Sequence, residues 1–304
     1  MSVGGANIDL CAKIPEFPRI DEEVEVTQLE ELPGGSAANY IVGVARLGVK
    51  AGFIGKIGDD HYGQILLDDF IREGVDVSQI RIENNIHSGT CLIPIDKDGN
   101  RKIFSFRGAN AKLFPIDIDP MYIKRASLLH ITSPPINVAE FIAKIARENE
   151  VLLSYDPGGK VIRKGLTFIE PILEKTDIFL PSSSELSFLF PELNDFKIAA
   201  YKLLNKYSIR IIAIKLGAQG CLIISKKEEI RSKGFNIKVI DTTGAGDSFA
   251  AAFTFGFQKG WALSKCAEIA NIAGALTVSR IGARTALPTM QEIETFLKKR
   301  NNLI

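Results

Sequence analysis

The stretch IDTTGAGDSFAAAF, from Ile240 to Phe253, combines small residues with one carboxylate in an order that suits phosphate chemistry. The residues just before Asp247 have almost no side-chain bulk, so a ligand can approach the backbone there closely. The residues after it have the spacing of a buried helix, and the first N–H groups of a helix are unpaired and partly positive. The pattern predicts an anion hole with a carboxylate just inside it, although an aspartate at this position is also a common helix cap.

The elements that must position this stretch follow an alternating order along the chain. Short apolar runs alternate with longer segments of helical period, which is typical of βαβ units around a parallel sheet. The expected buried strands are 51–58, 127–132, 151–156, 177–181 and 211–217. The expected helices are 36–47, 63–73, 138–149, 196–207, 245–259, 263–280 and 289–299. No segment has the composition of a linker, so we expect a single domain over residues 1–304.

Two segments depart from this order because apolar and polar residues alternate along them, at 22–35 and 89–106. Alternation is typical of a sheet with one solvated face, and an Asp-Gly pair inside the second segment predicts a hairpin turn. We expect a small antiparallel sheet that stands off the main domain, formed by segments of about 10–35 and 86–110. It is a lid over a site, half of a dimer interface, or an ordinary surface hairpin.

The composition excludes several classes of protein. Hydrophobic residues make up 46% of the chain, charged residues 24%, and the formal net charge is +1, so there is no general electrostatic reason to bind nucleic acid or anionic lipid. No stretch approaches the ~18 apolar residues that span a bilayer, and the N-terminus does not resemble a signal peptide. The four cysteines form no C-x-x-C pair, which fits a reducing compartment. We expect a cytoplasmic protein that binds neither membranes nor nucleic acid.

Two motifs resemble a known family. The chain has no P-loop and no convincing G-x-G-x-x-G fingerprint. Instead, DTTGAGDSFAAAF resembles one signature of the ribokinase family, the PfkB-type carbohydrate kinases, and LPGGSAANYIVGVARLGVKAGFIGKIGDDHYG at 32–63 resembles the other. The resemblance covers essentially the whole chain. It implies a ribokinase-like three-layer α/β/α sandwich with a mostly parallel central sheet and a small antiparallel β lid, and dimerisation through that lid.

The same resemblance implies which residues act in catalysis. Asp247 matches the family's catalytic base, which takes the proton from a primary hydroxyl of the sugar. The backbone N–H groups of Gly244, Ala245 and Gly246 would hold the migrating phosphoryl group of ATP. An aspartate of ordinary pKa, about 3.9, is a weak base, which is tolerable because phosphoryl transfer needs little activation of the nucleophile.

The residues that would bind the sugar lie in the N-terminal part. Asp9 matches an aspartate that binds sugar hydroxyls, Gly34 and Gly35 match the hinge of the lid, and Asn39 matches a substrate-binding asparagine. Arg107 lies in a segment that resembles the end of the lid, and is either a contact for a substrate carboxylate or a solvated residue at the rim.

Nucleotide and metal contacts are implied farther along the chain. Lys215, Gly217 and Gly220 match the strand and turn that border ATP, and Asn271 matches the lining of the adenine pocket. Glu185 matches the glutamate of the family's N-x-x-E motif, which organises Mg²⁺ through water.

The chain departs from the family pattern at two of these places. Ser182 replaces the asparagine of N-x-x-E, and Ser36 stands where ribokinase itself carries a lysine. Asp241 and Thr243 match the start of a loop that binds a monovalent cation, so activation by K⁺ is a further expectation.

The sequence therefore predicts an ATP-dependent sugar kinase that uses Mg²⁺. Ribose, 2-keto-3-deoxygluconate and fructose are the candidate acceptors, in that order. A nucleoside kinase of the same family is the alternative, and a non-catalytic sugar-binding or regulatory protein is a third.

Overall fold

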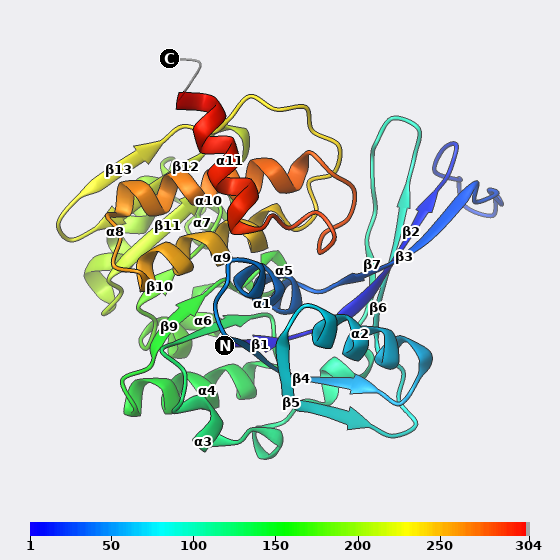
Figure 1. The fold of residues 1–304 in the computed structure, drawn as a ribbon, viewed down its shortest axis with the longest axis horizontal. Coiled ribbons are helices and arrows are strands. Elements are labelled where there is room, and N and C mark those ends of the chain that lie inside the picture. Colours follow the sequence, from blue (N-terminus) through cyan, green and yellow to red (C-terminus); the bar gives the residue numbers. More distant parts are fainter. Residues whose placement is uncertain (302–304) are drawn as a thin grey trace.

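The middle layer of the molecule is a nine-stranded sheet (Figure 1). A computed structural model describes residues 1–301, with the side chains of residues 1–299. The strands follow the order β13-β12-β11-β10-β9-β8-β1-β4-β5, and all neighbours are parallel except β11–β12 and β12–β13. Their bounds are β1 (Ser2–Gly4), β4 (Ala51–Gly58), β5 (Val75–Glu83), β8 (Leu128–Thr132), β9 (Leu152–Tyr155), β10 (Ile178–Phe179), β11 (Ile211–Lys215), β12 (Cys221–Ser225) and β13 (Glu229–Ser232).

Helices cover both faces of this sheet, and each face has its own hydrophobic core. Helices α1, α2, α9 and α10 pack on one face, and α4, α6, α7 and α8 pack on the other. The helix bounds are α1 (Ser36–Arg46), α2 (His61–Arg72), α3 (Pro120–Ile123), α4 (Ile136–Glu148), α5 (Gly159–Ile162), α6 (Leu166–Leu173), α7 (Ser183–Leu189), α8 (Phe196–Lys206), α9 (Ala245–Gln258), α10 (Leu263–Val278) and α11 (Met290–Asn301). This arrangement confirms the expected three-layer α/β/α fold.

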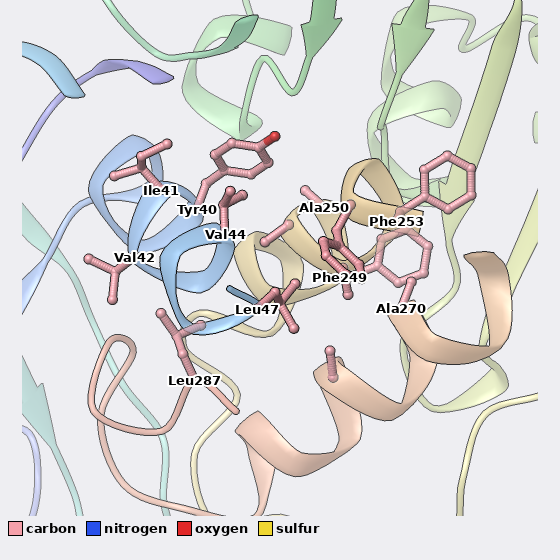
Figure 2. Packing of buried hydrophobic residues seen from close by; sticks show 14 of the residues in the cluster. Tyr40, Ile41, Val42, Val44, Leu47, Phe249, Ala250, Phe253, Ala270 and Leu287 are labelled. Carbon is pink, nitrogen blue, oxygen red and sulfur yellow. The ribbon is translucent and has the colours of Figure 1, made fainter. Parts of the chain in front are cut away.

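Helices α1 and α9 pack closely in the first of these cores (Figure 2). Val44 of α1 and Leu47, just after its end, point toward α9, where alanines such as Ala250 leave room for a neighbouring helix. A 2.8 Å hydrogen bond between the hydroxyl groups of Tyr40 and Thr254 adds a polar contact inside this apolar interface. Close packing of this kind resists movement of one helix relative to the other.

A second sheet of four strands stands off the main body (Figure 1). It has the order β3-β2-β6-β7, with bounds β2 (Asn7–Lys13), β3 (Gln28–Gly34), β6 (Gly89–Ile95) and β7 (Phe104–Phe106). The β2–β3 and β6–β7 pairs are antiparallel as expected, but β2 and β6 pair in parallel, so the small sheet is mixed. The predicted Asp-Gly turn lies between β6 and β7, where Gly99 has a φ of 81°.

Side chains alternate between the two faces of this small sheet. Asp9, Cys91 and Ser105 lie in one register row and share one face. Leu92 and Phe104 pair in the adjacent row and point the other way, where both are exposed. One face is therefore polar and the other apolar. Among the described residues, no helix combines the length and the apolar character needed to cross a membrane.

Candidate active site

Helix α9 begins at a turn that only glycine can form. Gly244 lies just before the helix with a φ of 79°, in the left-handed region. A Cβ atom on Gly244 would lie 2.5 Å from the carbonyl oxygen of Ala283, so both the backbone angle and the lack of space exclude other residues. The backbone of Ala245 and Gly246 follows in the first turn, where helix N–H groups have no partner inside the helix. The glycine turn therefore leads directly into the first turn of α9, which is the arrangement that the predicted anion hole needs.

Asp247 lies in the same first turn and is joined to α1. The side-chain amide of Asn39 donates a 2.9 Å hydrogen bond to its Oδ2 atom. Burial raises the pKa of Asp247 to about 7, and the negative charge of Asp156 adds to this, although Asn39 and Lys215 act against it. The expectation of a weak base with an ordinary pKa was wrong, because the sequence does not reveal this burial. A carboxylate with this pKa is a competent proton acceptor near neutral pH.

Arg284 organises the other side of Asn39 and was missed in the sequence. Its side chain is 1% exposed, and its guanidinium donates to Asn39 Oδ1 at 3.4 Å and to the Gly34 carbonyl at 2.6 Å. It also forms a 2.6 Å ion pair with Asp69, which is buried too. Because the guanidinium holds the amide oxygen of Asn39, the amide nitrogen is turned toward Asp247.

Asp9 lies directly against the hinge of the lid. A Cβ atom on Gly34 would lie 2.2 Å from Asp9 Oδ2, so the carboxylate reaches its position only because this residue is glycine. Gly35 follows, with a φ of 96°, and lies just before the first residue of α1. Burial raises the pKa of Asp9 to about 6, although Arg284 lowers it in part. The structure thus brings Asp9, the hinge glycines and Asn39 together, as expected.

A cavity of 240 Å³ lies between the lid and the start of α1. Cys91, Ser105 and Arg107 line it from the lid side, and Ser36 lines it from α1. Asp9 and Asp247 do not line the cavity themselves. A side-chain hydrogen bond joins Asp9 to Cys91, and another joins Asp247 to Ser36, and both partners line the cavity. The cavity has a partly polar lining, and the two carboxylates lie at its margin.

Lys215 approaches the anion hole from β11. A Cβ atom on Gly246 would lie 3.6 Å from its ammonium nitrogen, which places the positive charge beside the turn. The ammonium forms an ion pair with Asp156. Burial alone would lower the pKa of Lys215, but the charges of Asp156 and Glu185 raise it above its ordinary value. Lys215 is therefore a fixed cation where phosphate groups are expected.

The remaining nucleotide candidates lie on a turn and on α10. Gly217 and Gly220 both have positive φ angles and form the turn between β11 and β12. The Asn271 amide donates to the carbonyl groups of Ser232 and Lys233, at 3.2 Å each. Both acceptors line a cavity of 640 Å³ beside β13. Asn271 thus holds a wall of this cavity, which is large enough for a nucleoside group.

Glu185 is placed by the first turn of α7. Its Oε2 atom accepts hydrogen bonds from the Ser182 backbone at 2.7 Å and from the Ser182 hydroxyl at 2.9 Å. Ser182 therefore serves as the helix cap, as asparagine also can. In the described part of the chain, no group of three or more His, Cys, Asp or Glu side chains is close enough to hold a metal. One carboxylate with nucleotide phosphates and water is still an arrangement that Mg²⁺ accepts, so Glu185 fits this ion.

Asp241 and Thr243, the residues expected to bind a monovalent cation, are in contact with Arg101. Asp241 accepts hydrogen bonds from the Thr243 backbone at 2.9 Å and from the Gly282 backbone at 3.0 Å. Arg101, from the tip of the lid, donates to Asp241 at 3.4 Å and also to the Thr243 hydroxyl. A guanidinium already provides the positive charge at this carboxylate, so the side chains as placed do not fit K⁺.

A lidded three-layer fold with an acid at the start of a glycine-led helix is the architecture of kinases that phosphorylate carbohydrates. This chain belongs to the pfkB family of carbohydrate kinases, whose model matches residues 1–290. A sugar kinase of Archaeoglobus fulgidus is 38% identical over 252 residues, which cover 81% of this chain and 98% of that protein. The ATP-dependent ribose-1-phosphate kinase of Halopiger xanaduensis is 31% identical over 300 residues, with 99% and 98% covered.

Solved structures are similar over nearly the whole chain. Arabidopsis thaliana ribokinase, in complex with ribose and ATP, has a TM-score of 0.89 and 27% identity, with 98% of this chain and 97% of that chain covered. An Escherichia coli putative ribokinase II with ATP and Mg²⁺ has a TM-score of 0.88 and 26% identity, with 98% of each chain covered. The nucleoside kinase of Methanocaldococcus jannaschii has a TM-score of 0.84 and 25% identity, with 98% and 97% covered. The protein is a carbohydrate kinase of the ribokinase fold.

Proposed function

We propose that the enzyme transfers the γ-phosphoryl group of ATP to a primary hydroxyl of a sugar, with Asp247 as the base. The observation that carries this proposal is the contact between Asn39 and Asp247 beside the glycine turn, because it places a proton acceptor next to an anion hole. The hydroxyl oxygen forms a bond to the γ-phosphorus, the bond to the bridging oxygen breaks, and ADP leaves. The hydroxyl proton goes to Asp247, whose raised pKa suits this role.

The backbone of Gly244, Ala245 and Gly246 stabilises the charge on the transferred group. Gly244 lies just before α9, and Ala245 and Gly246 begin it, so their N–H groups have no partner inside the helix, and the helix dipole adds to their effect. Lys215 contributes a positive charge from the other side. Mg²⁺, when bound near Glu185, supplies further neutralisation of the nucleotide phosphates.

The nucleotide extends from the turn at Gly217 and Gly220 toward the cavity beside Asn271. The positive φ angles of these glycines let the backbone approach the ribose and phosphates closely. The cavity of 640 Å³ then receives the adenine, and Asn271 keeps its wall in place. The neighbouring structures that contain ATP support this assignment.

The acceptor binds between the lid and the start of α1. Asp9 and Asn39 bind sugar hydroxyls, Gly34 and Gly35 form the hinge, and Arg107 closes the lid side. Ribose is the first candidate because a ribose-bound neighbour is 27% identical, and 2-keto-3-deoxygluconate and fructose follow. A nucleoside is the second candidate class, which the similarity to the Methanocaldococcus jannaschii nucleoside kinase supports.

A panel of sugars and nucleosides, assayed for ADP release with ATP and Mg²⁺, tests the proposal. We expect turnover with at least one sugar and loss of that turnover in the Asp247→Asn variant. Turnover with nucleosides alone would reverse the order of the two candidate classes. Unchanged turnover in the variant would remove the proposed base.

We also propose that the protein is cytoplasmic, acts as one domain with its lid, and forms a homodimer through that lid. Leu92 and Phe104 give the lid an apolar outer face, at 43% and 58% exposure. A second copy of the same face is a suitable cover, because it would bury both side chains on each partner.

A further inference from the structure

The cavity under the lid has an unbalanced charge. Among the described residues that line it, Arg107 and Lys160 are the charged ones, and none is an acid. The other lining groups that can form hydrogen bonds include Asn7, Ser36 and Ser105. A neutral sugar needs hydroxyl and amide partners, which these residues supply, but it leaves two positive charges without a counterion.

A backbone carbonyl, and not an acidic side chain, holds the guanidinium of Arg107. Residues 103, 105 and 107 alternate along the end of the lid and all line the cavity, so its side chain is on the inner face. Its guanidinium donates a 3.2 Å hydrogen bond to the carbonyl of Ser133, whose own φ of 54° is unusual for serine. Burial lowers the pKa of Arg107, and no acid in the described chain forms an ion pair with it.

Lys160 enters from the loop after β9 and likewise forms no ion pair within residues 1–299. The cations elsewhere around the site do have such partners: Lys215 pairs with Asp156, and Arg284 pairs with Asp69. Two unpaired cations on one cavity repel each other until an anion binds between them. Both side chains are still open to solvent, so a ligand can reach them.

We infer that the acceptor is a sugar that already carries an anionic group, held by Arg107 and Lys160 while a free hydroxyl lies near Asp247. This inference rests on the proposed function. A phosphate monoester fits best, because it carries nearly two negative charges at neutral pH and matches the planar fork of arginine. A carboxylate also accepts hydrogen bonds from arginine and lysine, but it carries only one negative charge. If the primary hydroxyl receives the new phosphate, the anionic group must be at the other end, as in an aldose 1-phosphate.

Acceptor assays on the full-length enzyme test this inference. We expect kcat/KM for ribose 1-phosphate to exceed that for ribose, and 2-keto-3-deoxygluconate shows whether a carboxylate is sufficient. Ribose 5-phosphate should give no turnover, because its primary hydroxyl is blocked and its phosphate is at the wrong end of the sugar for this subsite. Arg107→Gln and Lys160→Gln should each raise KM for the anionic acceptor about tenfold, with KM for ATP unchanged. Lys164→Gln, on the same surface but outside the cavity, is the matched control and should behave as wild type.

Binding measurements separate this inference from the proposed reaction. Calorimetry with ribose 1-phosphate and the Asp247→Asn variant, without ATP, reports the subsite alone. Binding that Arg107→Gln weakens supports the subsite even if no transfer is found, in which case the proposed reaction falls. Equal turnover of ribose in wild type and both cavity variants, with no binding of sugar phosphate, would overturn the subsite and leave the kinase. A rise in KM for ATP would overturn it as well, because the cations would then serve the nucleotide.

Discussion

The side-chain amide of Asn39 donates a 2.9 Å hydrogen bond to Oδ2 of Asp247, across 208 positions of sequence. Asn39 is in the first turn of α1, which follows the lid hinge, and Asp247 is in the first turn of α9, beside the anion hole. The contact therefore joins the part of the chain that we propose binds the acceptor to the part that we propose binds phosphate. Arg284 keeps the amide in the orientation that this contact needs.

Asp247→Asn should reduce kcat about a thousandfold, because general-base catalysis contributes on this scale. ATP binding should stay nearly unchanged, since the backbone of the turn remains intact. Steady-state kinetics and nucleotide titration check the two parts. A loss of both activity and ATP binding would instead indicate that the turn had been disrupted.

The same variant should also be more stable than wild type at alkaline pH. The pKa of Asp247 is raised to about 7 in the folded state from an ordinary 3.8, so the folded state binds its proton more tightly. Stability from this group is complete below the ordinary pKa and is lost as pH rises through 7. Between mildly acidic and alkaline pH, the variant should gain about 2 kcal/mol in the free energy of unfolding relative to wild type, allowing for partial solvent access. Urea titrations at both pH values measure this difference.

The pH profile of kcat/KM should show two acidic limbs. Asp247 and Asp9 must both be ionised, and burial raises their pKa values to about 7 and about 6. The rate should fall about tenfold per pH unit below the first value and about a hundredfold per unit below the second. An Asp9→Asn variant should keep only the first limb. A profile that stays flat through this range would contradict both assignments.

Arg284→Met should cost about 3 kcal/mol of stability, because it removes the buried cation from Asp69 and leaves only the exposed Arg72 as an ion-pair partner. Adding Asp69→Asn should restore most of the free energy of unfolding. It should not restore kcat, because the orientation of Asn39 would remain free. Unfolding titrations and kcat, measured for the single and double variants, separate the two effects. Recovery of both quantities in the double variant would reduce Arg284 to a purely structural residue.

Arg101→Ala should make the enzyme more sensitive to K⁺. The substitution exposes the carboxylate of Asp241, which the guanidinium otherwise neutralises. Activity in potassium chloride, compared with tetramethylammonium chloride at equal ionic strength, checks this. We expect a larger activation by K⁺ in the variant than in wild type. Strong activation of the wild type would show that the ion displaces Arg101.

Leu92→Glu should convert a dimer to a monomer, because it places a charge in the centre of the apolar outer face of the lid. Light scattering after gel filtration measures the mass. Ile116→Glu is a control, since Ile116 is also an exposed apolar residue, at 93%, but lies outside the lid. A wild-type protein that is monomeric at high concentration would contradict the proposed dimer.

Much of the fold could be predicted from local patterns. The apolar runs at 51–58 and 127–132 are the buried strands β4 and β8, because strands covered on both faces need continuous apolar sequence. Strands β5, β12 and β13 were not among the predicted strands. β5 and β13 are the edges of the sheet, where the apolar pattern is weaker, whereas β12 lies inside it, next to β11. The parallel pairing of β2 with β6 could not be predicted. The two strands are far apart in the sequence, and the alternation of apolar and polar residues within each strand does not show which strand pairs with which or in what direction.

In the candidate site, too, the features that depend on neighbouring residues could be predicted, and those that depend on distant contacts could not. The glycine turn and Asp247 are adjacent in sequence and were therefore recognisable. Arg284 was not, because a lone arginine in a loop gives no sign that its partner Asp69 lies 215 positions away. The pKa of Asp247 and the placement of Arg101 on Asp241 likewise arise from contacts between distant segments.

The close packing of α1 against α9 has a consequence for selectivity. The two helices share one core, and under the proposed function they carry Asn39, Asp247 and the glycine turn, which any acceptor would need. The lid and the loop after β9 line the cavity that we propose receives the acceptor. An inhibitor aimed at the glycine turn would therefore affect many kinases of this architecture, whereas one shaped to the underside of the lid could discriminate between them.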